Sequence, residues 1–220
     1  MRDAVIVSTA RTPIGKAYRG GFNATPSPTL AAHSIRAAVE RAGIEGAEVD
    51  DVVMGAALQQ GVQHTIGRTA ALRAGLPVTV AGMSIDRQCS SGVMSIATAA
   101  KQIIVDRMDV VVAGGVESIS MVQTPEMRVG PDPELLAMHK DIYMPMLQTA
   151  ETVAKRYNIS RDRQDEYAYR SQMRTAAAQA AGKFDDEIVP VKAKMAFKNK
   201  ETGEVTMTDV EVTKDEGNRA

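Results

Sequence analysis

The chain has 220 residues, of which 44% are hydrophobic and 24% charged, with a formal net charge of -1 at pH 7. This length suits one large domain or a domain with a smaller companion. The near-zero charge gives no reason to expect a nucleic-acid or membrane partner. No apolar stretch has the length of a membrane span or a signal peptide. The single cysteine excludes an intrachain disulfide, which fits a cytoplasmic location.

The first 118 residues alternate apolar runs with helical patterns. Strands are expected at residues 4–7, 52–58, 78–85 and 109–115, and helices at residues 29–42, 65–74 and 90–104. The run Val110-Val111-Val112-Ala113 does not alternate with polar residues, which indicates a strand covered on both faces. The order of the elements predicts an α/β layer structure around a parallel sheet.

The pattern changes after Glu117. Four prolines and little periodicity predict that residues 118–145 are mostly loop. Two further helices are expected at residues 147–157 and 161–181, and Ser160 caps the second. Two short strands are expected at residues 188–191 and 205–212, joined by a turn at Thr202-Gly203. We therefore expect two domains, residues 1–118 and residues 119–220.

Cys89 lies between a predicted strand and a predicted helix. A thiol in this position is suited to act as a nucleophile, because the helix N-terminus favours the thiolate, which is the attacking form. Ser90, Ser91 and Gly92 follow it, and these small residues leave room for a substrate and expose amides that suit a developing oxyanion. The alternative is a buried core cysteine, which is the usual role of a lone cysteine.

Five segments resemble, in the same order, motifs of the thiolases, the enzymes that make or cleave 3-ketoacyl-CoA. The segments are Ser8-Thr9-Ala10-Arg11-Thr12-Pro13-Ile14-Gly15, Asp86-Arg87-Gln88-Cys89-Ser90-Ser91-Gly92, Gly114-Gly115-Val116-Glu117-Ser118-Ile119-Ser120, Thr149-Ala150-Glu151-Thr152-Val153-Ala154 and Asp186-Glu187-Ile188-Val189-Pro190. The second is similar to the nucleophile motif of the family. The resemblance runs from residue 3 to the end of the chain.

The resemblance implies a thiolase-like layered αβα fold, represented by its N-terminal half, with an inserted α+β loop domain that binds CoA and the acyl group. It also implies an acetyl-CoA C-acyltransferase in which the Cys89 thiolate attacks the 3-keto carbon. Acetyl-CoA then leaves as its enolate, and the CoA thiol takes the acyl group from Cys89. Coenzyme A is a substrate in this chemistry, and neither a resident cofactor nor a metal is expected.

The resemblance also suggests residues for the substrate. Biosynthetic acetoacetyl-CoA thiolases usually place a histidine before the methionine of the acyl pocket, whereas Pro145 precedes Met146 here. This favours the broad-chain degradative type, with the acetoacetyl-CoA-specific biosynthetic type as the alternative. Met146 would contact the acyl group, although a core role is equally expected of it. Arg219, in a poorer local match, corresponds to a CoA-contacting arginine.

Two other groups of residues receive a structural interpretation. Lys192, Lys194, Lys198 and Lys200 form a basic cluster, for which a solvated charged face is favoured over a site for CoA phosphates. His33 shares a predicted helix face with charged residues and is expected to be solvated. No histidine has a sequence relation to Cys89 that indicates a Cys–His pair.

The chain lacks the motifs of the second half of a thiolase: an Asn-containing motif, a Gly-His-Pro histidine that activates the nucleophile, and a second cysteine that acts as acid and base. We therefore expect a C-terminal half or a complementing chain, and by resemblance a homodimer or homotetramer. Because acid–base catalysis contributes about 10²–10⁴-fold, an isolated half should be nearly inactive. The competing hypotheses are a condensing enzyme that uses acyl-carrier protein and a non-catalytic subunit that pairs with another chain.

Overall fold

The computed structural model describes residues 2–220, which form two compact units. The first unit contains the residues up to Met127 together with Asp185–Gly217, and the second contains Arg128–Phe184 with Asn218–Ala220. This division does not coincide with the boundary expected at residue 118, because the C-terminal β-hairpin packs on the first unit.

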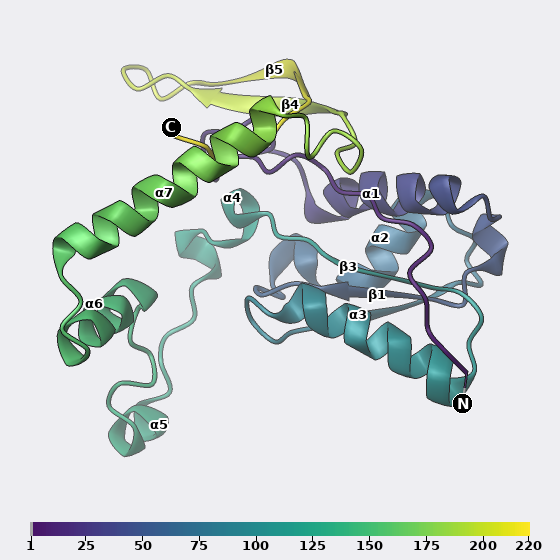
Figure 1. Ribbon diagram of the computed structural model, residues 1–220, viewed down its shortest axis with the longest axis horizontal. Coiled ribbons are helices and arrows are strands. Elements are labelled where there is room, and N and C mark those ends of the chain that lie inside the picture. Colours follow the sequence, from purple (N-terminus) through teal and green to yellow (C-terminus); the bar gives the residue numbers. More distant parts are fainter. Residues whose placement is uncertain (1) are drawn as a thin grey trace. The chain divides into compact units, whose positions relative to one another are not determined.

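Helices and parallel strands make up the first unit, as predicted for an α/β structure (Figure 1). In chain order its elements are α1 (Ser27–Ala42), η1 (Gly46–Glu48), β1 (Asp51–Gly55), η2 (Gly61–Gln63), α2 (Ile66–Ala74), β2 (Ala81–Ile85), α3 (Ser91–Lys101), a π-helical turn (Gln102–Asp106), β3 (Val111–Gly115), α4 (Ile119–Val122), η4 (Pro125–Met127), β4 (Val191–Lys198) and β5 (Val205–Val212). The main helices and the strands β1, β2, β3 and β5 lie within a few residues of their predicted ranges. β4 begins at the last residue of the strand expected at residues 188–191.

The sheet has the strand order β2-β1-β3, and both pairs of strands are parallel. The central strand β1 is buried along its whole length, and its Val53 pairs with Met83 on one side and Ala113 on the other. Helices α1 and α2 lie over one face of the sheet and α3 lies over the other (Figure 1). The predicted three-layer arrangement is confirmed.

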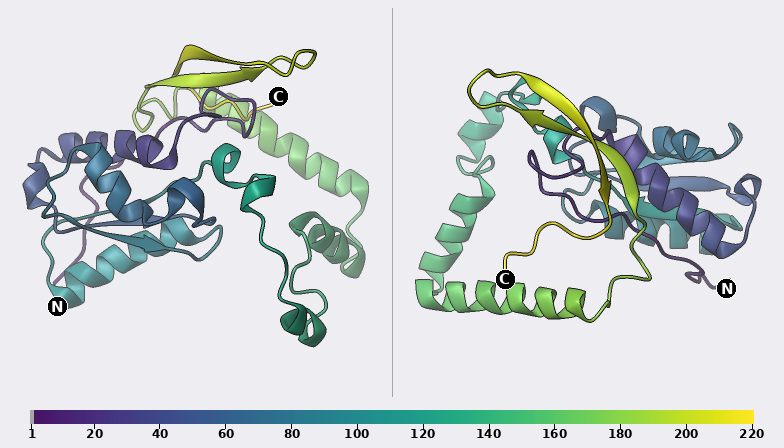
Figure 2. Two further views of the ribbon diagram at one scale, coloured as in Figure 1. Left: turned by 180° about the vertical axis from the view of Figure 1, so that it is seen from behind. Right: turned by 90° about the horizontal axis from the view of Figure 1, so that it is seen from above.

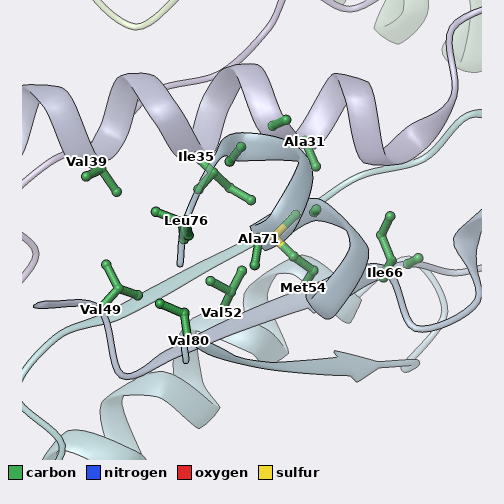
Figure 3. Close-up of a cluster of buried hydrophobic side chains, with 14 residues drawn as sticks. Ala31, Ile35, Val39, Val49, Val52, Met54, Ile66, Ala71, Leu76 and Val80 are labelled. Atoms are coloured by element: carbon green, nitrogen blue, oxygen red, sulfur yellow. The ribbon is translucent and has the colours of Figure 1, made fainter. Parts of the chain in front are cut away.

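The main hydrophobic core lies between the sheet and the layer of α1 and α2 (Figure 3). Ile35 of α1 and Ala71 of α2 pack over Val52 and Met54 of β1. Alternate residues of a strand point to opposite faces, so Val53 is buried on the α3 side. The shortage of aromatic residues leaves a core built of small aliphatic side chains, which lets the layers approach closely.

The apolar run at residues 4–7 does not form a strand, which corrects the sequence prediction. Val5, Ile6 and Val7 are each more than 70% exposed, and within residues 2–220 they pair with no strand. A strand needs a hydrogen-bonded neighbour, and β3 is separated from this segment.

Helix α3 buries a different face from the one that its apolar pattern suggests. Ser91, Ser95 and Ala99 are buried, whereas Val93 is 68% and Ile96 45% exposed. The small residues face inward because the helix lies very close to the sheet. The exposed apolar residues leave an uncovered apolar surface.

The hairpin of β4 and β5 is attached to the N-terminal loop by an ion-pair cluster. The Arg11 guanidinium donates to Asp215 at 2.7 and 3.0 Å and to Glu187 at 2.6 Å. The hydrogen bond to Arg11, together with one from the Ile14 amide, lowers the pKa of Asp215 despite partial burial. Figure 2 shows the two antiparallel strands and the turn between them, which Gly203 makes at a φ of 75°.

The second unit is helical and consists of α5 (Pro133–Met138), α6 (Met146–Arg156), α7 (Arg161–Ala180) and connecting segments. The Ser160 side chain caps α7 by accepting a hydrogen bond from the Arg163 amide at 3.3 Å, as predicted. None of these helices contains a buried residue. Between residues 2 and 220, no helix combines the length and the apolar character needed to span a membrane.

Candidate active site

The first turn of α3 lies directly on the carboxyl ends of β1 and β3. A Cβ atom on Gly55 would stand 2.3 Å from the carbonyl carbon of Ser91, and one on Gly115 would stand 3.0 Å from Cα of Gly92. Ser95 Oγ lies 2.7 Å from the carbonyl oxygen of Gly114. Gly55 and Gly115 are therefore positions where the backbone of α3 approaches the strand ends closely.

The loop before α3 is held by local hydrogen bonds. Ser91 Oγ accepts from the Arg87 amide at 2.9 Å and donates to the Gln88 carbonyl at 2.6 Å. Asp86 Oδ1 accepts from the Gln88 amide at 2.8 Å. Gln88 has a φ of 48°, a left-handed conformation that is unusual for a side chain of this type. These contacts define the backbone on both sides of Cys89.

Cys89 is a free thiol and is exposed, so it is not the buried core cysteine of the alternative reading. It lies two residues before α3 begins, where the first amides of a helix have no intrahelical acceptor. Such amides and the helix dipole favour an anion, which suits both a thiolate and a developing oxyanion. Among residues 2–220, no histidine side chain is hydrogen-bonded to this thiol.

A buried polar network next to β1 and β3 was not recognised in the sequence. Gln63 is fully buried, and its Oε1 accepts from Ser27 Oγ at 2.6 Å and from the Ser118 amide at 2.8 Å. Its Nε2 donates to the Leu58 carbonyl at 2.6 Å and to Glu117.

Glu117 in turn joins the two strand ends. It follows β3, and its other carboxylate oxygen accepts from the Ala57 amide, just after β1, at 2.7 Å. The Gly-Gly-x-Glu-Ser motif was the only signal for this residue, because its partners are distant in the sequence.

The other predicted site residues belong to the second unit. Met146 is the first residue of α6 and is 78% exposed, and Pro145 precedes it as the N-cap. The Arg219 amide donates to Gln172 Oε1 at 2.7 Å, and Asn218 Nδ2 donates to the Gln172 carbonyl at 2.9 Å. Cys89 belongs to the first unit.

The basic cluster has the features of a solvated charged face. On β4, Lys192 and Lys194 are exposed and stand opposite Glu211 and Asp209 of β5. Lys194 forms an ion pair with Asp209 at 2.7 Å. Acidic partners on the neighbouring strand reduce the attraction of this face for phosphate.

His33 differs from its expectation, because it is half-buried rather than solvated. Burial lowers the pKa of His33, and the charges of Arg36 and Arg73 lower it further. Across the described residues, 2–220, no group of three or more His, Cys, Asp or Glu side chains is arranged to hold a metal ion.

The layered sheet and the exposed thiol before α3 define an α/β protein with Cys89 at the carboxyl edge of the sheet, where proteins of this class bind their ligands. Residues 4–219 match the family model described as the N-terminal domain of thiolase, and the chain belongs to the thiolase family. The thiolase-like αβα fold predicted from the sequence is thereby confirmed.

Several thiolases and acetyltransferases are similar to the chain. It is 42% identical over 193 residues to a 3-ketoacyl-CoA thiolase of Bacillus subtilis, covering 87% of this chain and 49% of that protein. It is 43% identical over 203 residues to an acetyl-CoA acetyltransferase of Cupriavidus necator, covering 87% of this chain and 51% of that protein. The crystal structure of the Bacillus anthracis acetyl-CoA acetyltransferase matches with a TM-score of 0.80 and 36% identity, over 100% of this chain and 56% of that one. The chain thus spans about half the length of these relatives.

Proposed function

We propose that this chain carries the acyl-accepting nucleophile of an acetyl-CoA C-acyltransferase, and that Cys89 is that nucleophile. The observation that carries the proposal is the exposed thiol in a hydrogen-bonded loop immediately before α3. The names of the relatives, 3-ketoacyl-CoA thiolase and acetyl-CoA acetyltransferase, support this class of reaction.

The proposed reaction has two halves. The Cys89 thiolate attacks the 3-keto carbon of 3-ketoacyl-CoA, forming a C–S bond. The C2–C3 bond then breaks, acetyl-CoA leaves as its enolate, and a proton donor converts the enolate to acetyl-CoA. Next, CoA thiol gives up its proton and attacks the Cys89 thioester, which yields acyl-CoA and restores the thiolate. The reverse sequence from two acyl-CoA molecules forms a C–C bond.

The chain supplies the nucleophile but not the expected acid and base. Its sequence contains one cysteine, so the second catalytic cysteine expected by resemblance would come from polypeptide outside these residues. The same applies to the histidine of the Gly-His-Pro motif. We therefore infer that the 220-residue chain alone accepts an acyl group slowly and turns over poorly.

The finer assignments are part of the same proposal. Met146 and Arg219 are the candidates for contacting the acyl group and CoA, and Pro145 favours a broad-chain degradative enzyme over the acetoacetyl-CoA-specific type.

The exposed apolar residues of α3, such as Val93, support an assembly with a C-terminal half or complementing chain. A homodimer or homotetramer follows only from resemblance. A free exposed thiol without a disulfide partner suits the cytoplasm.

Alkylation of Cys89 with iodoacetamide at neutral pH tests the nucleophile assignment. The native chain should alkylate quickly. Because the chain alone accepts an acyl group slowly, prolonged incubation with acetyl-CoA should precede the labelling; it should slow the alkylation and leave one acetyl group on the protein, detected by intact mass. Cys89→Ser should show neither adduct, whereas Met94→Leu, on the same helix, should behave as the parent. Slow alkylation that acetyl-CoA leaves unchanged would show that Cys89 is not the acyl acceptor.

A non-catalytic subunit is the second candidate function, favoured by the exposed apolar residues of α3. It predicts tight association with another chain and no acetyl group on Cys89 in the complex. Intact mass of the complex after incubation with acetyl-CoA therefore separates the two functions.

A further inference from the structure

A buried pair of polar side chains joins the start of β1 to the end of α3. Asp51, the first residue of β1, is 6% exposed, and Gln102, the first residue of the π-helical turn after α3, is 9% exposed. Asp51 shares the strand face of Val53, which is the face that α3 covers. Gln102 Nε2 donates to Asp51 Oδ2 at 2.7 Å. The pair therefore lies at the amino end of the parallel sheet, away from the edge that carries Cys89.

The second oxygen of each side chain has no partner. Asp51 Oδ1 and Gln102 Oε1 are both buried without a hydrogen bond among residues 2–220. An ionised carboxylate and an amide oxygen only accept hydrogen bonds, so neither can satisfy the other. Turning the Gln102 amide over does not help, because it exchanges the two amide atoms and again leaves two acceptors without a hydrogen. The two side chains thus have one hydrogen too few between them.

An ionised Asp51 would also carry an uncompensated charge, because it takes part in none of the salt bridges formed by residues 2–220. The charged residues of the elements around it are all exposed. They are Asp50 before β1, Lys101, Asp106 and Arg107 at the end of α3, and Asp109 before β3, whereas β2 has none. A buried carboxylate without a cation is strongly disfavoured against its neutral form.

Neither a water molecule nor a divalent metal ion suits this place. The structure encloses Asp51 Oδ1 and Gln102 Oε1 so tightly that a water molecule cannot touch them. A buried water needs room of its own and about two to four polar partners. Calcium and magnesium take about six or more oxygen ligands. A proton, in contrast, needs no additional space.

A proton on Asp51 satisfies both side chains. A protonated carboxyl group donates one hydrogen bond and still accepts through its other oxygen. Asp51 Oδ1 then donates to Gln102 Oε1 while Gln102 Nε2 donates to Asp51 Oδ2, so the acid and the amide are joined by two hydrogen bonds. The same proton removes the buried charge.

We propose that Asp51 and Gln102 form a buried proton-binding site, in which a neutral acid and an amide are paired at neutral pH. The Gln102 carbonyl accepts from the Arg107 amide, which closes the π-helical turn, and from the Met108 amide at 3.3 Å. The proton therefore fastens this turn, and with it the end of α3, to the start of the central strand. Its release leaves a buried charge and two facing acceptors, which loosens the turn at alkaline pH. The proposal does not depend on the chemistry of Cys89.

The sign of the resulting pH dependence follows from the proton count. An unfolded aspartate loses its proton at about pH 4, whereas the folded pair keeps it, so the folded chain binds one more proton above that pH. The contribution of this site to the ratio of folded to unfolded chain then falls about tenfold per pH unit until the folded pair also ionises. The lowered pKa values of Asp215 and His33 act in the opposite direction, and a substitution at Asp51 leaves both of them in place.

Asp51→Asn tests the proposal, because asparagine offers the same two hydrogen bonds without a titrating proton. Urea unfolding of the parent and the variant is compared between pH 5 and pH 7. The folded-to-unfolded ratio of Asp51→Asn should gain on that of the parent by about tenfold per pH unit, or about 100-fold over this range. Asp50→Asn is the control at an exposed neighbour, and its difference from the parent should not grow with pH. A difference between Asp51→Asn and the parent that is the same at every pH would contradict the proposal.

A second measurement needs no variant. In the carbon-13-labelled parent, the side-chain carboxyl carbon of Asp51 should have the chemical shift of a neutral acid at pH 6, with the exposed Asp50 as the reference for the ionised form. It should move to the ionised position only at alkaline pH. An ionised signal of Asp51 at pH 6 would overturn the proposal. If that ionised signal also changed when sodium was replaced by choline, the occupant would be a cation instead of a proton.

Discussion

Gly55 and Ser91 are in backbone contact, and this contact places the loop that contains Cys89 on the end of the central strand. A Cβ atom on Gly55 would stand 2.3 Å from the Ser91 carbonyl carbon and 2.4 Å from its oxygen. Neither atom can move without shifting the first turn of α3. Cys89 lies two residues before Ser91, so its position depends on the absence of a side chain at Gly55, the last residue of β1.

Gly55→Ala should destabilise the chain by about 3 kcal/mol, because the added methyl group meets backbone atoms rather than a flexible side chain. Urea unfolding measures the stability, and iodoacetamide labelling should report a changed Cys89 rate in the folded variant. Gly130→Ala is the matched control, since nothing lies within 4 Å of its Cβ position. A Gly55→Ala variant as stable as the control would contradict the backbone contact.

The buried side-chain amide of Gln63 makes four hydrogen bonds. It accepts from Ser27 and Ser118 and donates to Leu58 and Glu117. Gln63→Leu keeps the volume similar but removes all four of these hydrogen bonds from a buried site, so we expect a loss of about 3–5 kcal/mol in unfolding free energy. Chemical denaturation measures this loss. The same substitution at the exposed Gln123 should change stability by less than about 0.5 kcal/mol. Similar effects at both positions would argue against the network.

The ion pair of Arg11 and Asp215 predicts a loss of stability in acid. Its hydrogen bonds lower the pKa of Asp215 below the ordinary value of 3.8, so the unfolded chain binds the proton more readily. The stabilisation is complete above that value and disappears as pH falls through the lower folded-state pKa.

Asp215→Asn should lower the unfolding free energy by about 1–2 kcal/mol at pH 7. It should also reduce the loss of stability that occurs as the pH is lowered. Asp209→Asn is the control on the same hairpin, because its side chain is 83% exposed and its pair with Lys194 should contribute less than about 1 kcal/mol. Urea midpoints from pH 2 to pH 7 measure both variants. If Asp215→Asn retains the full acid dependence, another group must cause it.

His33 predicts a second pH dependence of stability. Its folded-state pKa lies below the ordinary value of 6.5, so the unfolded chain binds more protons near that pH. Stability should be full above about pH 6.5 and should decline as pH falls through the lowered pKa. His33→Gln should remove this decline, whereas the exposed His139→Gln should retain it. Thermal unfolding from pH 5 to pH 8 provides the measurement, and an unchanged slope in His33→Gln would exclude this histidine as the cause.

Much of the local structure was predictable from the sequence. Helix periodicity identified α1, and the Ser160 cap identified the start of α7. Gly43 adopts the left-handed conformation that ends α1 at a φ of 68°. The position of Cys89 just before a helix was also predictable. These features depend on residues that are close in the chain, whose conformational preferences act over one or two turns.

The sequence did not reveal which distant residues come into contact in the folded chain. The apolar stripe of α3 resembled a buried face, yet the small face with Ser95 is the one in contact with the sheet. Residues 4–7 have the composition of a strand but remain unpaired, because a strand forms only where a neighbour accepts its hydrogen bonds. Glu117 and Gln63 are polar residues without a local motif that links them, and only the fold brings them together.

By itself, the sequence determined the layered α/β class, the family and the placement of the single cysteine at a strand–helix junction. Only the tertiary structure decided that Cys89 is exposed and that Gly55 carries the first turn of α3. The physical reason is the range of the interactions. Periodicity and capping act between near neighbours, whereas burial and strand pairing depend on contacts between residues that are distant in the chain.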